Sequence, residues 1–192
     1  MSAIIGTFGD AAKLVATVYL GAAQIHTFPI DLSIRTTLAC DTDRVAPTPT
    51  LHIPDVAELP QFRCLSLADQ IADKIAAMYE VHGTNATPST RWHDLVDLLL
   101  IIARFPFDAA KTTRALHIQQ ERRDHLTLPA AITRPGPQRG TAYPKQAHTS
   151  SLPAELHQLD TALATLGRCL NQLLDQSITT GTWNPATRQW DA

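Results

Sequence analysis

Apolar and polar residues alternate along the first third of the chain. Residues 14–20 are rich in β-branched and aromatic side chains, and residues 24–34 place every second side chain on an apolar face. The side chains on that face are Phe28, Ile30, Leu32 and Ile34. Gly21 lies between the two runs, so the pattern predicts a β-hairpin over 13–34. Because proline has no N–H to donate, Pro29 predicts an edge position or a bulge in the second strand.

From residue 66 onward the apolar residues recur at helical spacing. Four helices are predicted, over 66–82, 90–105, 108–125 and 153–176. Ser66 has the side chain of a helix N-cap. The second helix is apolar nearly all round, which predicts that it is the central buried helix. The third helix ends in the sequence ERRDH, which we interpret as a solvated charged face.

Three further segments lack a clear helical pattern. Residues 36–64 contain several prolines, and short strands are predicted around Leu51–Ile53 and Phe62–Leu65. Residues 126–151 are rich in Pro, Gly, Thr and Ser and predict a long loop. The tail WNPATRQW carries two tryptophans, which we expect to dock on the helices.

These elements together predict an α+β fold. A small, incomplete antiparallel sheet from the N-terminal third is expected to pack on a C-terminal helical bundle. We expect two parts, a sheet part over residues 1–65 and a helical part over residues 66–192.

Composition narrows the class of protein. The formal net charge of −2 gives no whole-molecule field for non-specific nucleic-acid binding. The three cysteines, Cys40, Cys64 and Cys169, are isolated and are expected to be reduced thiols. The histidines show no metal-ligand spacing. No apolar run is long enough to span a membrane and no signal peptide is apparent, so a cytoplasmic protein is expected.

Asp31 lies on the polar face of the second predicted strand, between Ile30 and Leu32. Aspartate is depleted in strands. The carboxylate is either a metal ligand at the rim of a sheet or an ordinary solvent-facing side chain, and spacing alone favours the second interpretation.

Lys74 projects from the edge of the apolar stripe of the first helix, because it lies within about 40° of Met78 at about 100° per residue. A lysine at such an edge either lays its stem along apolar surface or points into a cleft, where its compact charge suits a triphosphate. The pattern leaves both open.

Arg91, Asp94 and Asp97 are spaced by three, which places them near one face at the start of the second helix. Acids there suit the helix dipole. Because Asp97 lies between Val96 and Leu98, we expect it to be the buried, structural carboxylate, with Arg91, Lys74 or a backbone donor as its partner.

Two segments, SLADQIADKIAAMYEVHG and PSTRWHDLVDLLLI, resemble the AbiEii/AbiGii toxin nucleotidyltransferases of the DNA-polymerase-β-like superfamily. The family's helical lysine matches Lys74, and the carboxylate of its following segment matches Asp94. The strand FPIDLSI resembles the one that carries the family's third metal-binding acid, which matches Asp31. The resemblance is strongest over 62–103, moderate over 13–34 and loose beyond, and it suggests the C-terminal portion of the family only.

The resemblance implies nucleotide transfer from a nucleoside triphosphate to an RNA acceptor, with tRNA as a candidate, and with Mg²⁺ as cofactor. Asp31 would bind metal, Lys74 would contact the triphosphate, and Asp94 would be a catalytic or orienting carboxylate. Arg91 would hold Asp94 or a phosphate. The resemblance also implies a cognate antitoxin as a partner.

Two departures from the family pattern suggest an alternative. His93 stands where the family has a lysine, and no Asp-x-Asp element precedes the predicted hairpin. A two-metal site needs several carboxylates close together. The alternative expectation is therefore a non-catalytic remnant or partner-binding protein of a toxin–antitoxin system, or one that needs a separate chain to complete its site.

Overall fold

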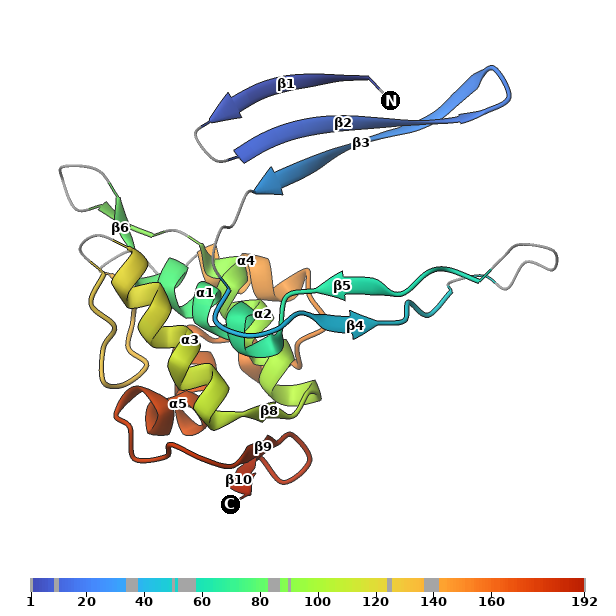
Figure 1. Ribbon diagram of the computed structural model, residues 1–192. Helices are drawn as coiled ribbons and strands as arrows, with labels where there is room; N and C mark the ends of the chain where they lie inside the picture. The colour runs from blue at the N-terminus through green and yellow to red at the C-terminus, as the bar shows by residue number, and fades with distance from the viewer. Residues whose placement is uncertain are drawn as a thin grey trace. The chain divides into compact units, whose positions relative to one another are not determined.

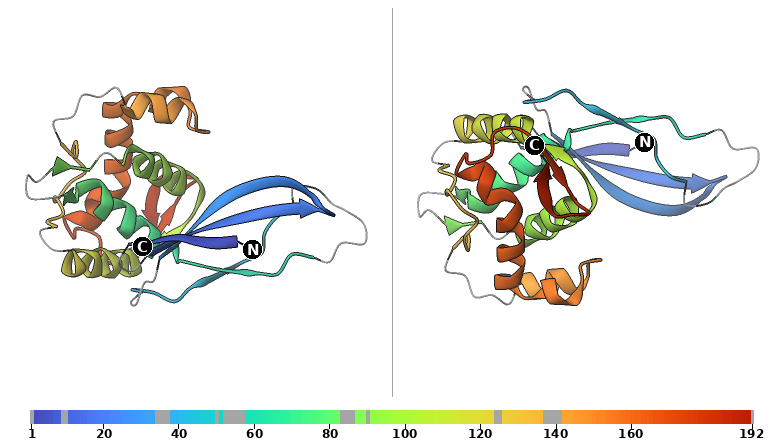
Figure 2. Two further views of the ribbon diagram at one scale, coloured as in Figure 1. Left: turned by 90° about the horizontal axis from the view of Figure 1, so that it is seen from above. Right: turned by 90° about the horizontal axis from the view of Figure 1, so that it is seen from below.

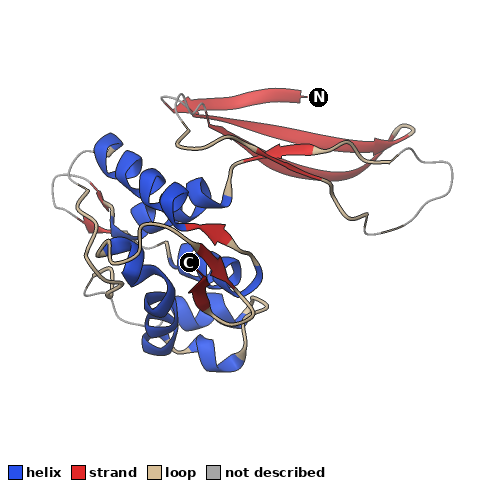
Figure 3. Ribbon diagram, turned by 60° about the horizontal axis from the view of Figure 1, so that its bottom comes forward, coloured by secondary structure: helices blue, strands red, loops and turns tan. Residues whose placement is uncertain are grey.

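The computed structural model divides the chain into two compact units, Met1–Leu38 and Ala39–Ala192. The residues it describes are 2–8, 11–33, 38–49, 51, 58–82, 87–89, 91–123, 126–136 and 142–191. The elements described in the first unit are strands, and the second unit combines helices with small antiparallel sheets (Figure 3). The predicted α+β class is therefore confirmed.

The N-terminal unit is a three-stranded antiparallel sheet in the order β1-β2-β3 (Figure 1). Its strands are β1 (Ser2–Phe8), β2 (Ala11–Leu20) and β3 (Ala23–Ser33). Gly21, at φ +59°, makes the tight turn between β2 and β3, a conformation that glycine adopts without steric cost. The predicted hairpin is confirmed, and so is the edge position of Pro29, because β3 ends the sheet. Ile34 lies outside the described residues.

The segment after this sheet belongs to the helical unit. β4 (Asp43–Val45) pairs with β5 (Phe62–Cys64), which confirms the strand expected around 62–65. Leu51 lies in a bend, and the rest of the expected strand 51–53 lies outside the described residues. The amides of Ala39 and Cys40 donate to the carboxylate of Asp69, at 2.9 and 3.2 Å. These bonds tie the start of the segment to the first helix.

The helices follow the predicted order with shorter limits. They are α1 (Leu67–Tyr79), α2 (Trp92–Arg104), α3 (Ala109–Arg122), α4 (Ala142–His148) and α5 (Leu159–Leu174), with a 3₁₀ turn, η1 (Ala154–His157), before α5. Ser66 caps α1 as expected, accepting from the amide of Asp69 at 3.1 Å. The first helix stops early because Glu80 turns extended and leads into β6 (Val81–His82), which pairs with β7 (Thr87–Pro88).

One helix was not predicted. α4 forms inside residues 126–151, which we expected to be a long loop. Its sequence offers one apolar pair at helical spacing, Tyr143 and Ala147, and Tyr143 is fully buried and donates a hydrogen bond to the carbonyl of Leu156 at 2.6 Å. A tertiary contact therefore stabilises this helix, which is too short for a single apolar pair to predict it from the sequence.

The core of this unit forms around α2, as its all-round apolarity predicts. Leu95, Leu98 and Leu99 are at most 1% exposed, and they pack with residues of α1, α3 and α5. Residues of α1 and α5 in the same core include Ile71, Ile75, Leu166 and Leu170. Among the described residues, no helix is long and apolar enough to cross a membrane. The three cysteines are free.

The C-terminal tail docks on the helices, as expected. β8 (Phe107–Asp108), β9 (Thr182–Asn184) and β10 (Gln189–Asp191) form a small sheet that lies against the helices in every view (Figures 1 and 2). The indole of Trp183 donates to the carbonyl of Ile102 at 2.7 Å, and that of Trp190 donates to the carbonyl of Cys169 at 3.0 Å.

Candidate functional site

Lys74 of α1 lies between two carboxylates of α2. Its ammonium nitrogen Nζ is 3.3 Å from Oδ1 of Asp94 and 2.5 Å from Oδ2 of Asp97. The lysine side chain is 22% exposed, consistent with its position at the edge of the apolar stripe. The convergence of Lys74 and Asp94, expected from the resemblance, is thus found.

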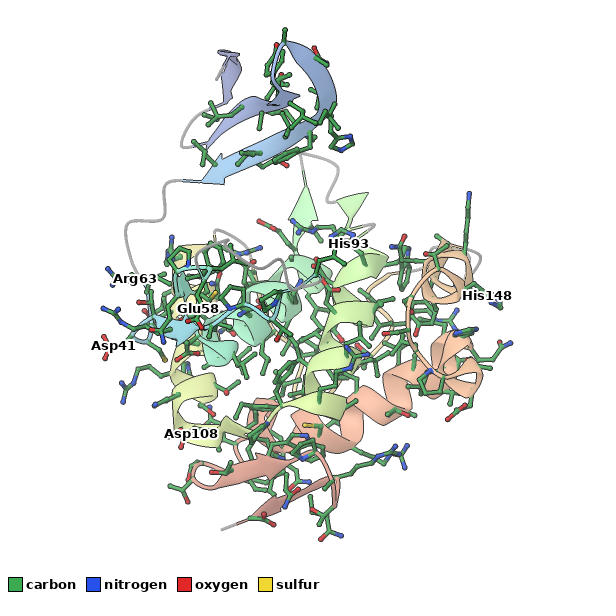
Figure 4. The ribbon with its side chains drawn as sticks, turned by 90° about the vertical axis from the view of Figure 1, so that its right-hand side faces the viewer. Asp41, Glu58, Arg63, His93, Asp108 and His148 are labelled. Carbon is green, nitrogen blue, oxygen red and sulfur yellow. The ribbon has the colours of Figure 1, made fainter. Side chains whose placement is uncertain are left out.

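Asp94 is the buried carboxylate of the cluster, at 1% exposure. It lies in the first turn of α2, where the helix dipole favours a negative charge. Nε of Arg91 approaches its Oδ2 to 2.8 Å, and Nε2 of His93, labelled in Figure 4, approaches its Oδ1 to 3.5 Å. Oδ2 nevertheless accepts no hydrogen bond within the described part of the chain, because the Arg91 contact is an ion pair without hydrogen-bond direction.

The expected role of Asp97 is wrong. We predicted a buried carboxylate, but its side chain is 44% exposed, and its recorded partner is Lys74, which is one of the partners expected for it. Burial of Val96 and Leu98 does not imply burial of Asp97, because neighbours in a helix point about 100° to either side.

A second ion-pair group lies between α1 and α3. Arg123 is 19% exposed and reaches Asp73 at 2.8 Å and Glu80 at 2.6 Å. The interpretation of the segment ERRDH as a solvated charged face is therefore wrong for Arg123. The partners lie 43 and 50 residues away in the chain, so local sequence gave no signal for them.

Asp31 belongs to the N-terminal unit. It lies on β3 opposite Lys13 of β2, and the two side chains form an ion pair at 3.6 Å. Its side chain is 80% exposed, which matches the solvent-facing interpretation.

The described surroundings of Asp31 do not form a metal cage. Mg²⁺ prefers several oxygen ligands in near-octahedral geometry. The charged side chain beside Asp31 is instead the cation Lys13. Among the described residues, no group of three or more His, Cys, Asp or Glu side chains is arranged to hold a metal ion. A metal-binding role of Asp31 stays a prediction.

The cluster contains two cations, Lys74 and Arg91, and two carboxylates, Asp94 and Asp97, so the formal charges of these four residues balance. Two cations, Lys74 and Arg91, and the half-exposed His93 surround Asp94, while Asp97 balances Lys74 at the surface. Sequence reasoning found each of these residues except for the part of His93, and helical spacing gave no signal for it, because adjacent residues of a helix point in directions about 100° apart.

Comparison with family models gives one match to this chain. Residues 9–174 match the model described as nucleotidyl transferase AbiEii toxin, Type IV TA system. No curated protein matches. Because the match runs from the first hairpin through α5, the suggestion that only the C-terminal portion of the family is represented is not borne out. The chain belongs to the AbiEii nucleotidyltransferase toxin family.

Proposed function

We propose that this chain transfers a nucleotidyl group from a nucleoside triphosphate to the end of an RNA acceptor, with tRNA as the candidate RNA. In this reaction an RNA hydroxyl oxygen attacks the α-phosphorus, the bond from that phosphorus to the bridging oxygen breaks, and pyrophosphate leaves. The supporting observation is the cluster of Lys74 with Asp94, within a chain of this family.

Lys74 is the proposed triphosphate contact. An ammonium group has three N–H donors, and the two recorded contacts use two of them, on Asp94 and Asp97. The third donor can meet a phosphate oxygen because the side chain is partly exposed. Placing such a charge beside a leaving pyrophosphate favours the transition state electrostatically.

Asp94 is proposed as a positioning residue, since its burial keeps it away from a substrate in solvent. It holds Lys74 and Arg91 on one side of the helix start. Arg91 is half exposed and is proposed to turn from Asp94 to a phosphate group when a nucleotide binds.

Nucleotidyl transfer in this family also uses a divalent metal ion, which supplies charge neutralisation at the phosphates. We propose Mg²⁺ as that ion and Asp31 as one of its ligands. The described residues around Asp31 do not complete a metal cage. We also propose a cytoplasmic location, where nucleotides and tRNA are available.

The test is incubation of the purified protein with each α-³²P-labelled nucleoside triphosphate, total tRNA and Mg²⁺ or Mn²⁺. We expect label in tRNA with the wild type and none with Lys74→Ala. Lys145→Ala, which removes an exposed lysine of α4, is the matched control and should retain activity. Absence of incorporation by the wild type at every metal concentration would reject the proposal for this chain.

A second candidate is a partner-binding role within a toxin–antitoxin pair. The observation that favours it is the exposed apolar tip of the N-terminal hairpin, where Tyr19 is 58%, Leu20 is 74% and Ile25 is 59% exposed. Exposed apolar groups on a sheet commonly mark an interaction surface. A cognate antitoxin, or a chain completing the site, is the proposed partner. Size-exclusion chromatography with light scattering tests this, and a monodisperse, freely soluble monomer counts against it.

A further inference from the structure

A cavity of about 610 Å³ opens at the C-terminal half of α2, bounded by η1, α5 and the C-terminal hairpin. It is separate from the Lys74 cluster. Arg104 on its rim is ten residues after Asp94, which corresponds to roughly 15 Å along the helix axis. The volume is within the usual range for small-molecule sites, roughly 300–1,000 Å³.

The cavity combines an apolar floor with a basic rim. The apolar lining includes Leu99, Leu100, Ile102, Leu152 and Leu156, and it ends at the buried indole of Trp183. The charged lining residues are Arg104, Arg168, Arg188 and Glu155. Three positive charges and one negative charge leave a net charge of +2, in a chain whose overall formal charge is −2. Positive charge is therefore concentrated at this site, although the chain as a whole is negatively charged.

The arginines are held in place without being neutralised. Arg104 donates to the hydroxyl of Ser151 at 2.8 Å, and Arg168 donates to the hydroxyl of Thr165 at 3.1 Å. Within the described part of the chain, neither these two arginines nor Arg188 forms an ion pair with an acid. A hydroxyl that accepts from arginine keeps its own hydrogen to donate, so both hydroxyls can also meet an anion.

Arg188 occupies an unusual backbone position. Its φ of +56° lies in the left-handed region, which favours glycine or asparagine. The turn that precedes it is made by Asn184, whose side chain accepts from the amide of Ala186 at 3.0 Å and whose carbonyl accepts from Arg188 at 2.8 Å. The hydrogen bonds of this turn do not involve the arginine side chain. Residues in strained backbone conformations cluster at binding and active sites, so the strained position of Arg188 suggests a role in binding.

We propose that this cavity binds an organic phosphate dianion, with its apolar or aromatic body on the leucine floor and its phosphate on the arginine rim. A phosphate monoester carries close to two negative charges at neutral pH, which matches the +2 of the lining. Arginine binds phosphate oxygens through paired N–H groups. The same chemistry is presented by a free mononucleotide and by the phosphorylated end of an RNA strand, and the experiment separates the two sources.

The test is isothermal titration of the full chain carrying Lys74→Ala and Arg91→Ala, which removes both proposed phosphate contacts of the transferase site. The probes are adenosine 5′-monophosphate, octyl phosphate, a short 5′-phosphorylated RNA and inorganic phosphate. We expect organic phosphates to bind at least about tenfold more tightly than inorganic phosphate, and binding to weaken as salt increases. Preference for the RNA over the mononucleotide would identify a strand end as the ligand, and the reverse order would identify a free nucleotide.

Two variants test the rim. Arg168→Glu should weaken binding by about tenfold or more, since it reverses a charge on the rim. Arg188→Gly removes a side chain and also relieves the left-handed backbone, so it should weaken binding while leaving the melting temperature unchanged or raised. Arg114→Gln removes an exposed arginine of α3 that does not line the cavity, and it should bind as the parent does.

Several results would overturn the proposal. They are no binding of any phosphate probe, equal binding of organic and inorganic phosphate, unchanged binding by Arg168→Glu and Arg188→Gly, or binding of an Asp- and Glu-rich peptide without binding of phosphates. None of these outcomes depends on transferase activity, so failure of this proposal and failure of the proposed function are distinguishable.

Discussion

The two units of the chain differ in how deeply they bury their side chains. In the N-terminal sheet, none of the described side chains is fully buried, and Phe28 and Leu32 on its apolar face are 40% and 45% exposed. In the helical unit, Leu95 and Leu98 of α2 are 0% exposed. A sheet of three strands needs a hydrophobic face, or packing against a helix, to be stable by itself. The helical unit therefore contains the interior that specifies its own fold, whereas the sheet depends more on strand pairing.

The largest predicted effect concerns the centre of the helical unit. Leu98→Ala removes a fully buried side chain from α2 and leaves a cavity, so it should lower the free energy of unfolding by about 2–5 kcal/mol. Urea denaturation followed by circular dichroism at 222 nm measures this. A loss below about 1 kcal/mol would mean that α2 is not the centre of the core.

The next effect distinguishes the two carboxylates beside Lys74. Asp94→Ala removes a buried carboxylate that faces two cations, and it should cost about 1–3 kcal/mol of unfolding free energy. Asp97→Ala breaks a half-exposed ion pair and should cost less than about 1 kcal/mol. Thermal melts of both variants provide the comparison, and the opposite order would restore the structural role first expected of Asp97.

Tyr143 provides a prediction that depends on pH. Tyr143→Phe loses the hydrogen bond to the carbonyl of Leu156 and should cost about 0.5–1.5 kcal/mol at neutral pH. Burial raises the pKa of Tyr143 to about 12, above its ordinary value near 10. The unfolded chain therefore loses this proton first, and the stability that the neutral phenol contributes below about pH 10 is lost as pH rises toward 12.

The measurement is a series of urea titrations from neutral pH to pH 12 on the wild type and Tyr143→Phe. The stability difference between them should shrink through the upper part of that range. A difference that stays constant to pH 12 would contradict the raised pKa.

The smallest effect is expected at the tip of the N-terminal hairpin. Leu20→Ser replaces a side chain that is 74% exposed, so it should change the free energy of unfolding by no more than about 0.5 kcal/mol. The same change should reduce self-association if the exposed tip binds a partner. A large loss of stability would show instead that this residue is covered in the folded protein.

Much of the local structure could be predicted from the sequence. The alternation around Phe28 and Ile30 predicted the hairpin, and Gly21 marked its turn. Ser66 predicted the start of α1, and the all-round apolarity of residues 90–105 predicted the central helix. These are short-range signals, since residues within a few positions of one another determine strand alternation, capping and helical stripes.

The candidate site was predicted in part. The position of Lys74 at the edge of its stripe and its meeting with Asp94 follow from helical spacing together with the family resemblance. The sequence did not show which of the two carboxylates is buried. Spacing places Asp94 and Asp97 on the same face, and only the way α1 crosses α2 decides which of them is covered.

Contacts between distant residues were decided by the tertiary structure alone. Arg123 finds Asp73 and Glu80 across α1 and α3, α4 forms because Tyr143 is buried against η1, and three arginines from three elements meet at one cavity. Each of these depends on the relative placement of elements far apart in the chain. Local propensities determine which elements form, but the packing of their side chains determines which charges are buried, paired or left facing solvent.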